Sequence, residues 1–260
     1  MRGRGGAFIE MNGTGTLRDP SRVFFVSGID TGIGKTVATG LMSRFLRRRG
    51  VDHITVKMVQ TGCDGFSEDL DAHRAIAGLP RQPEDEAGLT APQIFHFPAS
   101  PTLAASLEGR ETDLDAIDRA VSSCASRRAI VLVEGAGGLL VPLTDSILAA
   151  DFAAKRDWPL ILVASGRLGA INHILLSLEA AAARRMRVIG VVMNHAPDTD
   201  PRVVDDAVQC TLRALERVGA PGALVRVPEI PEGAEVPDID FSPFFSGVSS
   251  AHSGVAEAIP

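Results

Sequence analysis

The residues best suited to chemistry form the stretch Gly28-Ile-Asp-Thr-Gly-Ile-Gly-Lys35-Thr36, which follows an apolar run at 23–26. Backbone N–H groups in such a loop, backed by the start of a helix, bind phosphate oxygens. Lys35 would reach the β- and γ-phosphates of a nucleotide, and the Thr36 hydroxyl would hold Mg²⁺. Five residues separate Gly28 from the Gly-Lys pair, one more than usual, so the motif predicts a lengthened phosphate loop.

Three further charged residues could complete a phosphoryl-transfer site. Lys57 ends a second apolar run and could neutralise a transferring phosphoryl group, although a lysine at a sheet edge often only extends to solvent. Asp69 and Glu134 are candidate Mg²⁺ ligands, because Mg²⁺ usually takes one or two carboxylates together with phosphates and water. The plainer interpretations are a helix-start carboxylate for Asp69 and a strand-end charge for Glu134. Glu134 is the stronger candidate, since it follows four apolar residues at 130–133.

The motifs of several other nucleotide-binding classes are missing. ATPases of the partition and iron-protein type carry a lysine early in the loop, where this chain has Asp30. GTPases read guanine with Asn-Lys-x-Asp, and the segment here is Asn194-His-Ala-Pro. A dinucleotide fold needs G-x-G-x-x-G, which Gly135-Ala-Gly-Gly138 does not satisfy. No Ser–His–Asp or Cys–His arrangement is evident in the sequence, so no protein nucleophile is expected.

Short apolar runs that alternate with helical segments must position these residues. We expect strands at 23–26, 53–59, 130–133, 160–164, 188–193 and 224–227, and helices at 36–49, 67–77, 112–127, 170–185 and 201–218. The segment 79–92, rich in Pro, Glu and Asp, is expected to be an exposed loop. This alternation indicates an α/β fold of the P-loop type: a mostly parallel sheet with helices on both faces. The polar breaks after the strands would meet at one edge, where such sheets bind ligands.

Length and composition fit a single domain. The 260 residues are 45% hydrophobic and 22% charged, which is ample for a core. We expect a flexible tail at 1–20, the P-loop domain at 21–235 and a C-terminal tail at 236–260. Only three of the 26 basic residues are lysines, and two of these, Lys35 and Lys57, fall in the candidate site. Lys155 is expected to be an ordinary solvated residue.

Charge and cysteine usage exclude several partners. The net charge of −6 argues against nucleic acid, whose binding proteins usually carry a basic face. No apolar run reaches the roughly 18 residues of a membrane span. The three cysteines are far apart and lack metal-ligand spacing, so zinc and a disulfide framework are not expected. Free thiols fit a reducing cytosol, and we expect a cytoplasmic protein.

Five segments together resemble the dethiobiotin synthetase family. They are the lengthened loop at 25–36, Lys57-Met-Val-Gln-Thr61-Gly62, Val131-Leu-Val-Glu134-Gly-Ala-Gly-Gly138, Leu168-Gly-Ala-Ile-Asn172-His173, and a late strand that ends in Asn194. They occur in the family's order and span residues 22–231. The resemblance implies one P-loop domain that works as a homodimer. It also implies ATP and Mg²⁺ as cofactors.

The resemblance further implies a reaction that joins CO₂ to 7,8-diaminononanoate. One amine would form a carbamate, whose oxygen attacks the γ-phosphate of ATP to give a carbamic–phosphoric anhydride. The second amine would then close the ring of dethiobiotin and release phosphate. Such charge-dense steps need positioning more than a protein nucleophile.

Carried over by position, the family's site falls on four groups of residues. Catalysis would fall to Thr31, Lys35 and Lys57. Mg²⁺ would be held by Thr36, Asp69 and Glu134. The substrate would contact Thr61 and, from the partner subunit, Gly169, Ala170 and Asn172. The nucleotide would contact Gly28, Asp30, Thr31, Gly32, Ile33, Gly34, Lys35, Thr36, Val37, Glu134, Gly135, Gly137, Gly138 and Asn194, the last as an adenine-reading amide.

The chain departs from the family at some positions. Many members have Glu where this chain has Gly32, and the tyrosine that contacts substrate in some relatives has no counterpart, since the chain contains no tyrosine. His173 and His195 are expected to be structural neighbours. An alternative function is a regulatory or partitioning P-loop ATPase that acts through a protein partner. It would use Lys35 and Thr36, but it has no need of Lys57, Asp69 and the 169–172 helix start together. A cobyrinate-type synthetase would need a glutaminase domain, for which 260 residues leave no room.

Overall fold

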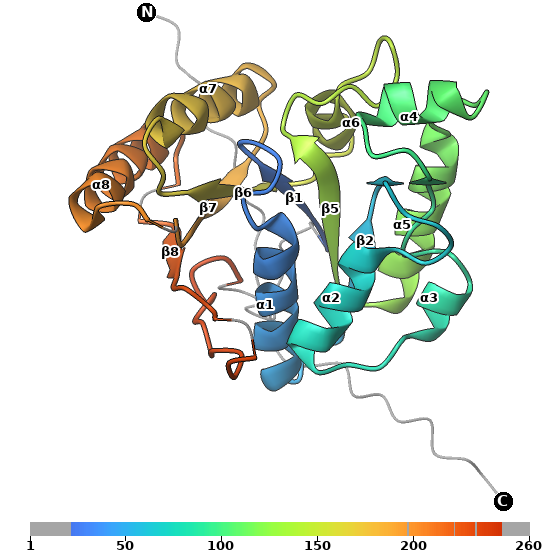
Figure 1. Ribbon diagram of the computed structural model, residues 1–260, viewed down its shortest axis with the longest axis horizontal. Coiled ribbons are helices and arrows are strands. Elements are labelled where there is room, and N and C mark those ends of the chain that lie inside the picture. The colour runs from blue at the N-terminus through green and yellow to red at the C-terminus, as the bar shows by residue number, and fades with distance from the viewer. Residues whose placement is uncertain (1–21, 197, 221, 232, 246–260) are drawn as a thin grey trace, which may run out of the picture.

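A six-stranded parallel sheet forms the centre of the computed structural model (Figure 1), which describes residues 22–196, 198–220, 222–231 and 233–245. The strands are β1 (Val23–Gly28), β2 (His53–Lys57), β5 (Ile130–Gly138), β6 (Leu160–Ser165), β7 (Val188–Asn194) and β8 (Leu224–Val227). Their order is β2-β5-β1-β6-β7-β8, and every pair is parallel. The α/β fold predicted from the sequence is thus confirmed. The expected tail at 1–20 lies outside the described residues.

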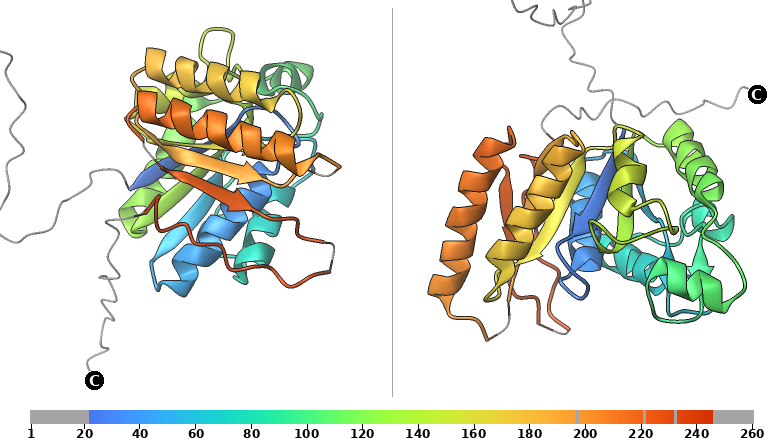
Figure 2. Two further views of the ribbon diagram at one scale, coloured as in Figure 1. Left: turned by 90° about the vertical axis from the view of Figure 1, so that its left-hand side faces the viewer. Right: turned by 90° about the horizontal axis from the view of Figure 1, so that it is seen from above.

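Helices cover both faces of the sheet. Helices α1 (Lys35–Arg48) and α2 (Glu68–Ala77) lie on one face, and α7 (Ala170–Ala183) and α8 (Pro201–Arg217) lie on the other (Figure 2). The remaining elements are α3 (Pro83–Glu86), α4 (Pro101–Leu107), α5 (Leu114–Arg127), α6 (Ala149–Ala154), and the two-stranded pair β3 (Gln60–Thr61) and β4 (Ile94–Phe95). No helix among the described residues has the length and apolar character needed to span a bilayer.

The strand register brings polar side chains to one edge of the sheet. Lys57 at the end of β2 is paired with Glu134 of β5, and Ser165 at the end of β6 is paired with Asn194 of β7. The chain leaves the central β1 toward β2 on one side, and after β5 it crosses to β6 on the other. Ligands of open α/β sheets bind at the carboxyl ends of strands near such a reversal.

Two segments differ from the sequence prediction. The strand expected at 53–59 ends at Lys57, and Gln60 and Thr61 form a separate strand with β4. The expected loop at 79–92 contains helix α3, whose Glu84 and Asp85 are buried. Both carboxylates are paired with arginines, Glu84 with Arg128 and Asp85 with Arg74, and this pairing allows charged residues to leave solvent.

Residues 238–245 pack onto the domain, although the sequence places them in a C-terminal tail. Phe241, Phe244 and Phe245 are buried, and Phe245 contacts Phe24 of β1 edge to face, with ring centroids 5.3 Å apart. Phe45 of α1 stacks on the same Phe245 ring. The segment therefore completes the core beneath α1, the helix that carries the phosphate loop.

Candidate functional site

The predicted phosphate loop connects β1 to α1 and depends on glycine conformation. Gly32 and Gly34 have φ of 70° and 83°, in the left-handed region that side chains disfavour. A Cβ on Gly34 would lie 2.5 Å from Nδ2 of Asn194, so this position has no room for a side chain. Gly34 precedes the first turn of α1, where no side chain caps the helix. Uncapped amides at a helix N-terminus suit phosphate oxygens.

Four side chains from different elements converge beside this loop, and we call them the carboxylate cluster: Thr36, Lys57, Asp69 and Glu134. The Lys57 ammonium donates to Oε1 of Glu134 at 2.8 Å and also pairs with Asp69. The Thr36 hydroxyl lies 2.9 Å from Oδ1 of Asp69 and 3.2 Å from Oε1 of Glu134. The structure therefore brings together all four residues that the sequence singled out.

Burial and pairing set the charges in this region. Burial, followed by the nearby Lys57 ammonium, lowers the pKa of Lys35 to about 8. Burial alone would lower the pKa of Lys57, but the Glu134 and Asp69 carboxylates outweigh it and raise that pKa. Burial alone would raise the pKa of Glu134, yet Lys57 and His73 hold it well below its usual range. Glu134 is thus a carboxylate although it is fully buried.

The carboxylate cluster fits a Mg²⁺ site. The oxygens of two carboxylates and one hydroxyl lie close together beside the loop. Mg²⁺ prefers oxygen ligands and usually takes only one or two of them from protein carboxylates. Across the described ranges, no three His, Cys, Asp or Glu side chains are grouped as a metal cage made of protein alone. Thr36, Asp69 and Glu134 would therefore hold the cation together with phosphate oxygens and water.

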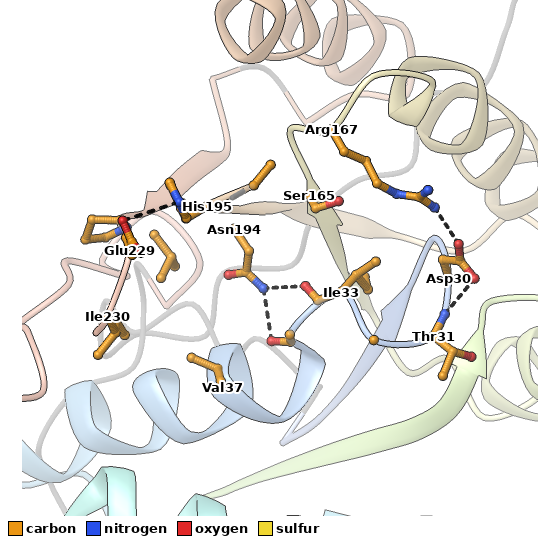
Figure 3. A pocket seen from close by; sticks show the side chains of 15 residues that line it. Asp30, Thr31, Ile33, Val37, Ser165, Arg167, Asn194, His195, Glu229 and Ile230 are labelled. Carbon is orange, nitrogen blue, oxygen red and sulfur yellow. Dashed lines mark hydrogen bonds and ion pairs between the residues drawn. The ribbon is translucent and has the colours of Figure 1, made fainter. Parts of the chain in front are cut away.

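A cavity of about 650 Å³ opens on the other side of the phosphate loop, and we call it the loop cavity. Its lining is Asp30, Thr31, Gly32, Ile33, Gly34, Val37, Ser165, Arg167, Asn194, His195, Ala196, Val227, Pro228, Glu229 and Ile230. Figure 3 shows an Arg167–Asp30 pair on one side of Asn194 and a His195–Glu229 pair on the other. These pairs span 2.5 Å and 3.6 Å.

Asn194 has a fixed orientation in the loop cavity. Its Nδ2 donates to the carbonyl oxygens of Ile33 and Gly34, at 2.7 and 3.0 Å, which leaves no second way to place the amide. Its Oδ1 is buried and has no hydrogen-bond partner. Leaving a buried acceptor without a hydrogen bond costs free energy, so this oxygen is suited to accept a hydrogen bond from a ligand.

The predicted substrate residues do not join these two regions within one chain. Thr61 is half-buried on β3, and Asn172 is exposed on the first turn of α7. Ala170 is fully buried, while Gly169 lines a separate cavity of about 400 Å³ beside α8. Of the two histidines expected to be structural, His173 is exposed on α7 and His195 lines the loop cavity.

Other residues predicted to contact the nucleotide lie in or beside the phosphate loop. Thr31 is exposed at the tip of the loop, and Lys35 donates to the carbonyl oxygen of Asp30 at 2.8 Å. Val37 lines the loop cavity from α1. The glycines of β5 run beside the loop: a Cβ on Gly138 would lie 3.5 Å from the carbonyl oxygen of Gly28. Gly135 and Gly137 precede it on the same strand.

Two groups of site residues are not predicted by the sequence. His73 is fully buried and lies 2.7 Å from Oε2 of Glu134. Its signal was available, since Asp69 and His73 are four residues apart and therefore share a face of α2. Residues 227–230 also line the loop cavity, but nothing in their local sequence indicates this.

Known proteins resemble this chain over most of its length. The AAA domain family matches residues 22–235. The ATP-dependent dethiobiotin synthetase BioD of Chlorobaculum tepidum is 47% identical over 76% of this chain and 83% of its own length. BioD 2 of Pasteurella multocida is 42% identical over 81% of this chain and 98% of its own length.

The BioD 2 protein of Haemophilus influenzae is 45% identical over 69% of this chain and 94% of its own length. The solved structure of a ParA family ATPase from Chlorobium tepidum covers 88% of this chain and 91% of its own, with 14% identity and a TM-score of 0.46. On the identity and coverage of these curated relatives, the chain belongs to the ATP-dependent dethiobiotin synthetase family.

Proposed function

We propose that this protein is an ATP- and Mg²⁺-dependent dethiobiotin synthase, which converts 7,8-diaminononanoate, CO₂ and ATP to dethiobiotin, ADP and phosphate. The observation that carries the proposal is the carboxylate cluster, which sets Lys57, Asp69, Glu134 and Thr36 against the phosphate loop in a chain of this family. A regulatory ATPase has no use for a second buried lysine at this position.

Each step would use positioned charge. A substrate amine adds to CO₂ and loses a proton, giving a carbamate, whose oxygen attacks the γ-phosphorus as ADP leaves. The second amine then attacks the carbonyl carbon of the mixed anhydride, loses a proton and expels phosphate. Lys35 would bind the phosphates, and Lys57 would face the transferring phosphoryl group and the carbamate. Mg²⁺ bound at Thr36, Asp69 and Glu134 would neutralise part of the negative charge on the phosphates.

Asn194 would select ATP through its free oxygen. Because Nδ2 is committed to two loop carbonyls, only Oδ1 can meet a base. The exocyclic amino group of adenine donates to such an oxygen, whereas guanine would present its own carbonyl oxygen there and leave two acceptors facing each other. The amide therefore favours ATP over GTP.

The substrate carboxylate would bind at the start of α7 of a second copy. Helix N-termini attract anions, and Gly169 leaves the first turn of α7 without a side-chain cap. Leu168, just before this turn, and Leu176, in the second turn of α7, are 82% and 56% exposed, which is typical of a surface that pairs with another protein. We therefore propose a homodimer whose sites are completed across the interface.

The decisive experiment follows labelled bicarbonate. Purified protein is incubated with ¹⁴C-bicarbonate, Mg²⁺, ATP and 7,8-diaminononanoate, and acid-stable label is counted. We expect label in dethiobiotin only when diamine and ATP are both present. If no label enters an acid-stable product, the proposal is wrong. ATP hydrolysis that ignores the diamine and responds to a protein would instead support the regulatory ATPase.

A further inference from the structure

His73 connects the carboxylate cluster to a buried polar network that the reaction itself does not require. It lies one turn after Asp69 on α2, and its side chain is fully buried. One ring nitrogen, Nε2, is 2.7 Å from Oε2 of Glu134. The other, Nδ1, is 3.1 Å from the hydroxyl of Thr55 on β2. The ring thus bridges a candidate metal ligand and the interior of the sheet.

The two oxygens of Glu134 have separate partners. Oε2 faces His73, while Oε1 faces the Lys57 ammonium and the Thr36 hydroxyl on the phosphate side. A hydrogen bond to one carboxylate oxygen opposes rotation about the last side-chain bond. The contact with His73 therefore presents Oε1, rather than either oxygen at random, to the phosphate loop.

The directions of the hydrogen bonds around His73 show that its Nε2 must carry a proton. Arg74 has only donors, so its contact of 2.6 Å with the Thr55 hydroxyl makes that oxygen an acceptor. The hydroxyl proton is then free to point to Nδ1 of His73. An ionised carboxylate only accepts, so Nε2 must carry the proton that reaches Glu134. The network therefore requires a proton on Nε2 of His73.

The far end of the network is anchored. Asp85 of α3 binds the Arg74 guanidinium through both oxygens, at 2.9 and 2.6 Å, and Thr90 donates to the same carboxylate at 2.7 Å. All of these side chains are buried. A continuous chain of contacts therefore runs from α3 through Arg74, Thr55 and His73 to Glu134.

We propose that His73 is a positioning residue, which holds Oε2 of Glu134 so that Oε1 is oriented toward the cation and phosphates. This inference rests on the proposed function, because it takes Glu134 as a Mg²⁺ ligand. Groups that hydrogen-bond a metal ligand typically change metal affinity by about 10- to 100-fold when removed.

The test compares two substitutions of different reach. His73→Gln keeps an N–H donor near the position of Nε2, whereas the shorter His73→Asn does not reach Glu134. Free Mn²⁺ is measured by electron paramagnetic resonance as Mn²⁺ is titrated into protein saturated with ADP. We expect His73→Asn to raise the Kd for Mn²⁺ about tenfold or more, and His73→Gln to raise it less than about threefold. ADP affinity measured in EDTA should be unchanged.

His53 provides the matched control. It is also buried on the β2 side, but its nitrogens contact Ser43 and Val51 rather than Glu134. His53→Asn should leave the Mn²⁺ Kd within about twofold of wild type, because it touches no member of the site. Wild-type Mn²⁺ affinity in His73→Asn, or an equal loss in His53→Asn, would overturn the proposal.

A measurement on the unmodified protein covers the case in which His73→Asn does not fold. Long-range ¹H–¹⁵N correlation spectra distinguish the two histidine tautomers, and the His73 signals are those missing from His73→Gln. We expect a proton on Nε2 of His73, and a ring protonated at Nδ1 alone would overturn the proposal. Unchanged Mn²⁺ affinity in Glu134→Gln would refute both the metal ligand and His73's role. Failure of the bicarbonate assay alone would refute only the proposed function.

Discussion

The carboxylate cluster and the loop cavity lie on opposite sides of one phosphate loop, and they differ in whether their polar groups have partners within the protein. In the carboxylate cluster every charged side chain already has a partner, and Glu134 has three. In the loop cavity, Oδ1 of Asn194 and Oγ of Ser165 are buried without partners. The first region is preorganised by the protein itself, whereas the second leaves hydrogen bonds for a ligand to complete.

The largest effect should come from Lys57→Ala. Removing a charge that stabilises a transferring phosphoryl group should lower turnover on the order of a thousandfold. ATP affinity measured by calorimetry should change less than about threefold, because the phosphate loop and loop cavity are untouched. Lys155→Ala, at an exposed site, is the control. Equal losses in turnover and affinity would contradict the role given to Lys57.

Asp85→Asn should have the next largest effect, on stability. It breaks a buried ion pair with Arg74, which costs about 3 kcal/mol of unfolding free energy when one partner is removed. Asp71→Asn breaks an exposed pair with Arg81 and should cost less than about 1 kcal/mol. Urea unfolding measures both. Similar losses would mean that the network behind the carboxylate cluster contributes no more than surface charge.

Asn194→Ala tests the loop cavity. The ratio of ATP affinity to GTP affinity should fall about tenfold, equivalent to about 1.4 kcal/mol, because the free Oδ1 that favours adenine is lost. Competition of both nucleotides against a fluorescent ADP analogue measures the ratio. Arg202→Ala, on exposed surface outside the loop cavity, should keep the wild-type ratio. A preference for ATP that survives in Asn194→Ala would show that other groups read the base.

The smallest effect concerns acid stability at α3. The Arg128 guanidinium beside Glu84 lowers the pKa of this carboxyl below its ordinary value of 4.5. A lowered pKa in the folded state adds stability above pH 4.5 that is lost as the pH falls through the folded pKa. Arg128 is partly exposed and keeps a second partner in Asp52, so the stability advantage over Glu84→Gln should be only about 1 kcal/mol at pH 7 and should shrink below pH 4.5.

The control for this pH series is Glu86→Gln, since Glu86 is exposed on the same helix. Thermal unfolding of the three proteins between pH 3 and pH 7 gives the comparison. An advantage that grows as the pH falls would reverse the sign expected for a paired carboxylate.

The sequence predicted the fold and the carboxylate cluster because both depend on local pattern. Apolar runs marked the six strands, and each of Lys57 and Glu134 stood at the end of such a run, where a parallel sheet gathers side chains. The phosphate loop could be predicted because its chemistry depends on a few glycines and a Gly-Lys-Thr sequence that are close together in the chain.

The missed features depend on contacts between distant segments. His73 and Thr55 look like ordinary helix and strand residues until Arg74 and Asp85 are seen beside them. The composition of segment 79–92 predicts an exposed loop because carboxylates are usually solvated, whereas arginines from other elements pair with Glu84 and Asp85. Phe241 likewise has no periodic neighbours, yet it fills the core against Phe45.

The scarcity of lysine has a practical consequence. Amine-directed reagents meet three side-chain targets: Lys155 is exposed, while Lys35 and Lys57 are buried beside the phosphate loop. With a pKa of about 8, Lys35 carries far more free amine at mildly alkaline pH than an ordinary lysine, whereas the raised pKa of Lys57 keeps that group protonated. Acylation followed by mass spectrometry would thus label Lys155 at all times and Lys35 only while its loop is vacant. The extent of Lys35 acylation would therefore measure how much of the phosphate loop is occupied, with the Lys155 peptide as an internal standard.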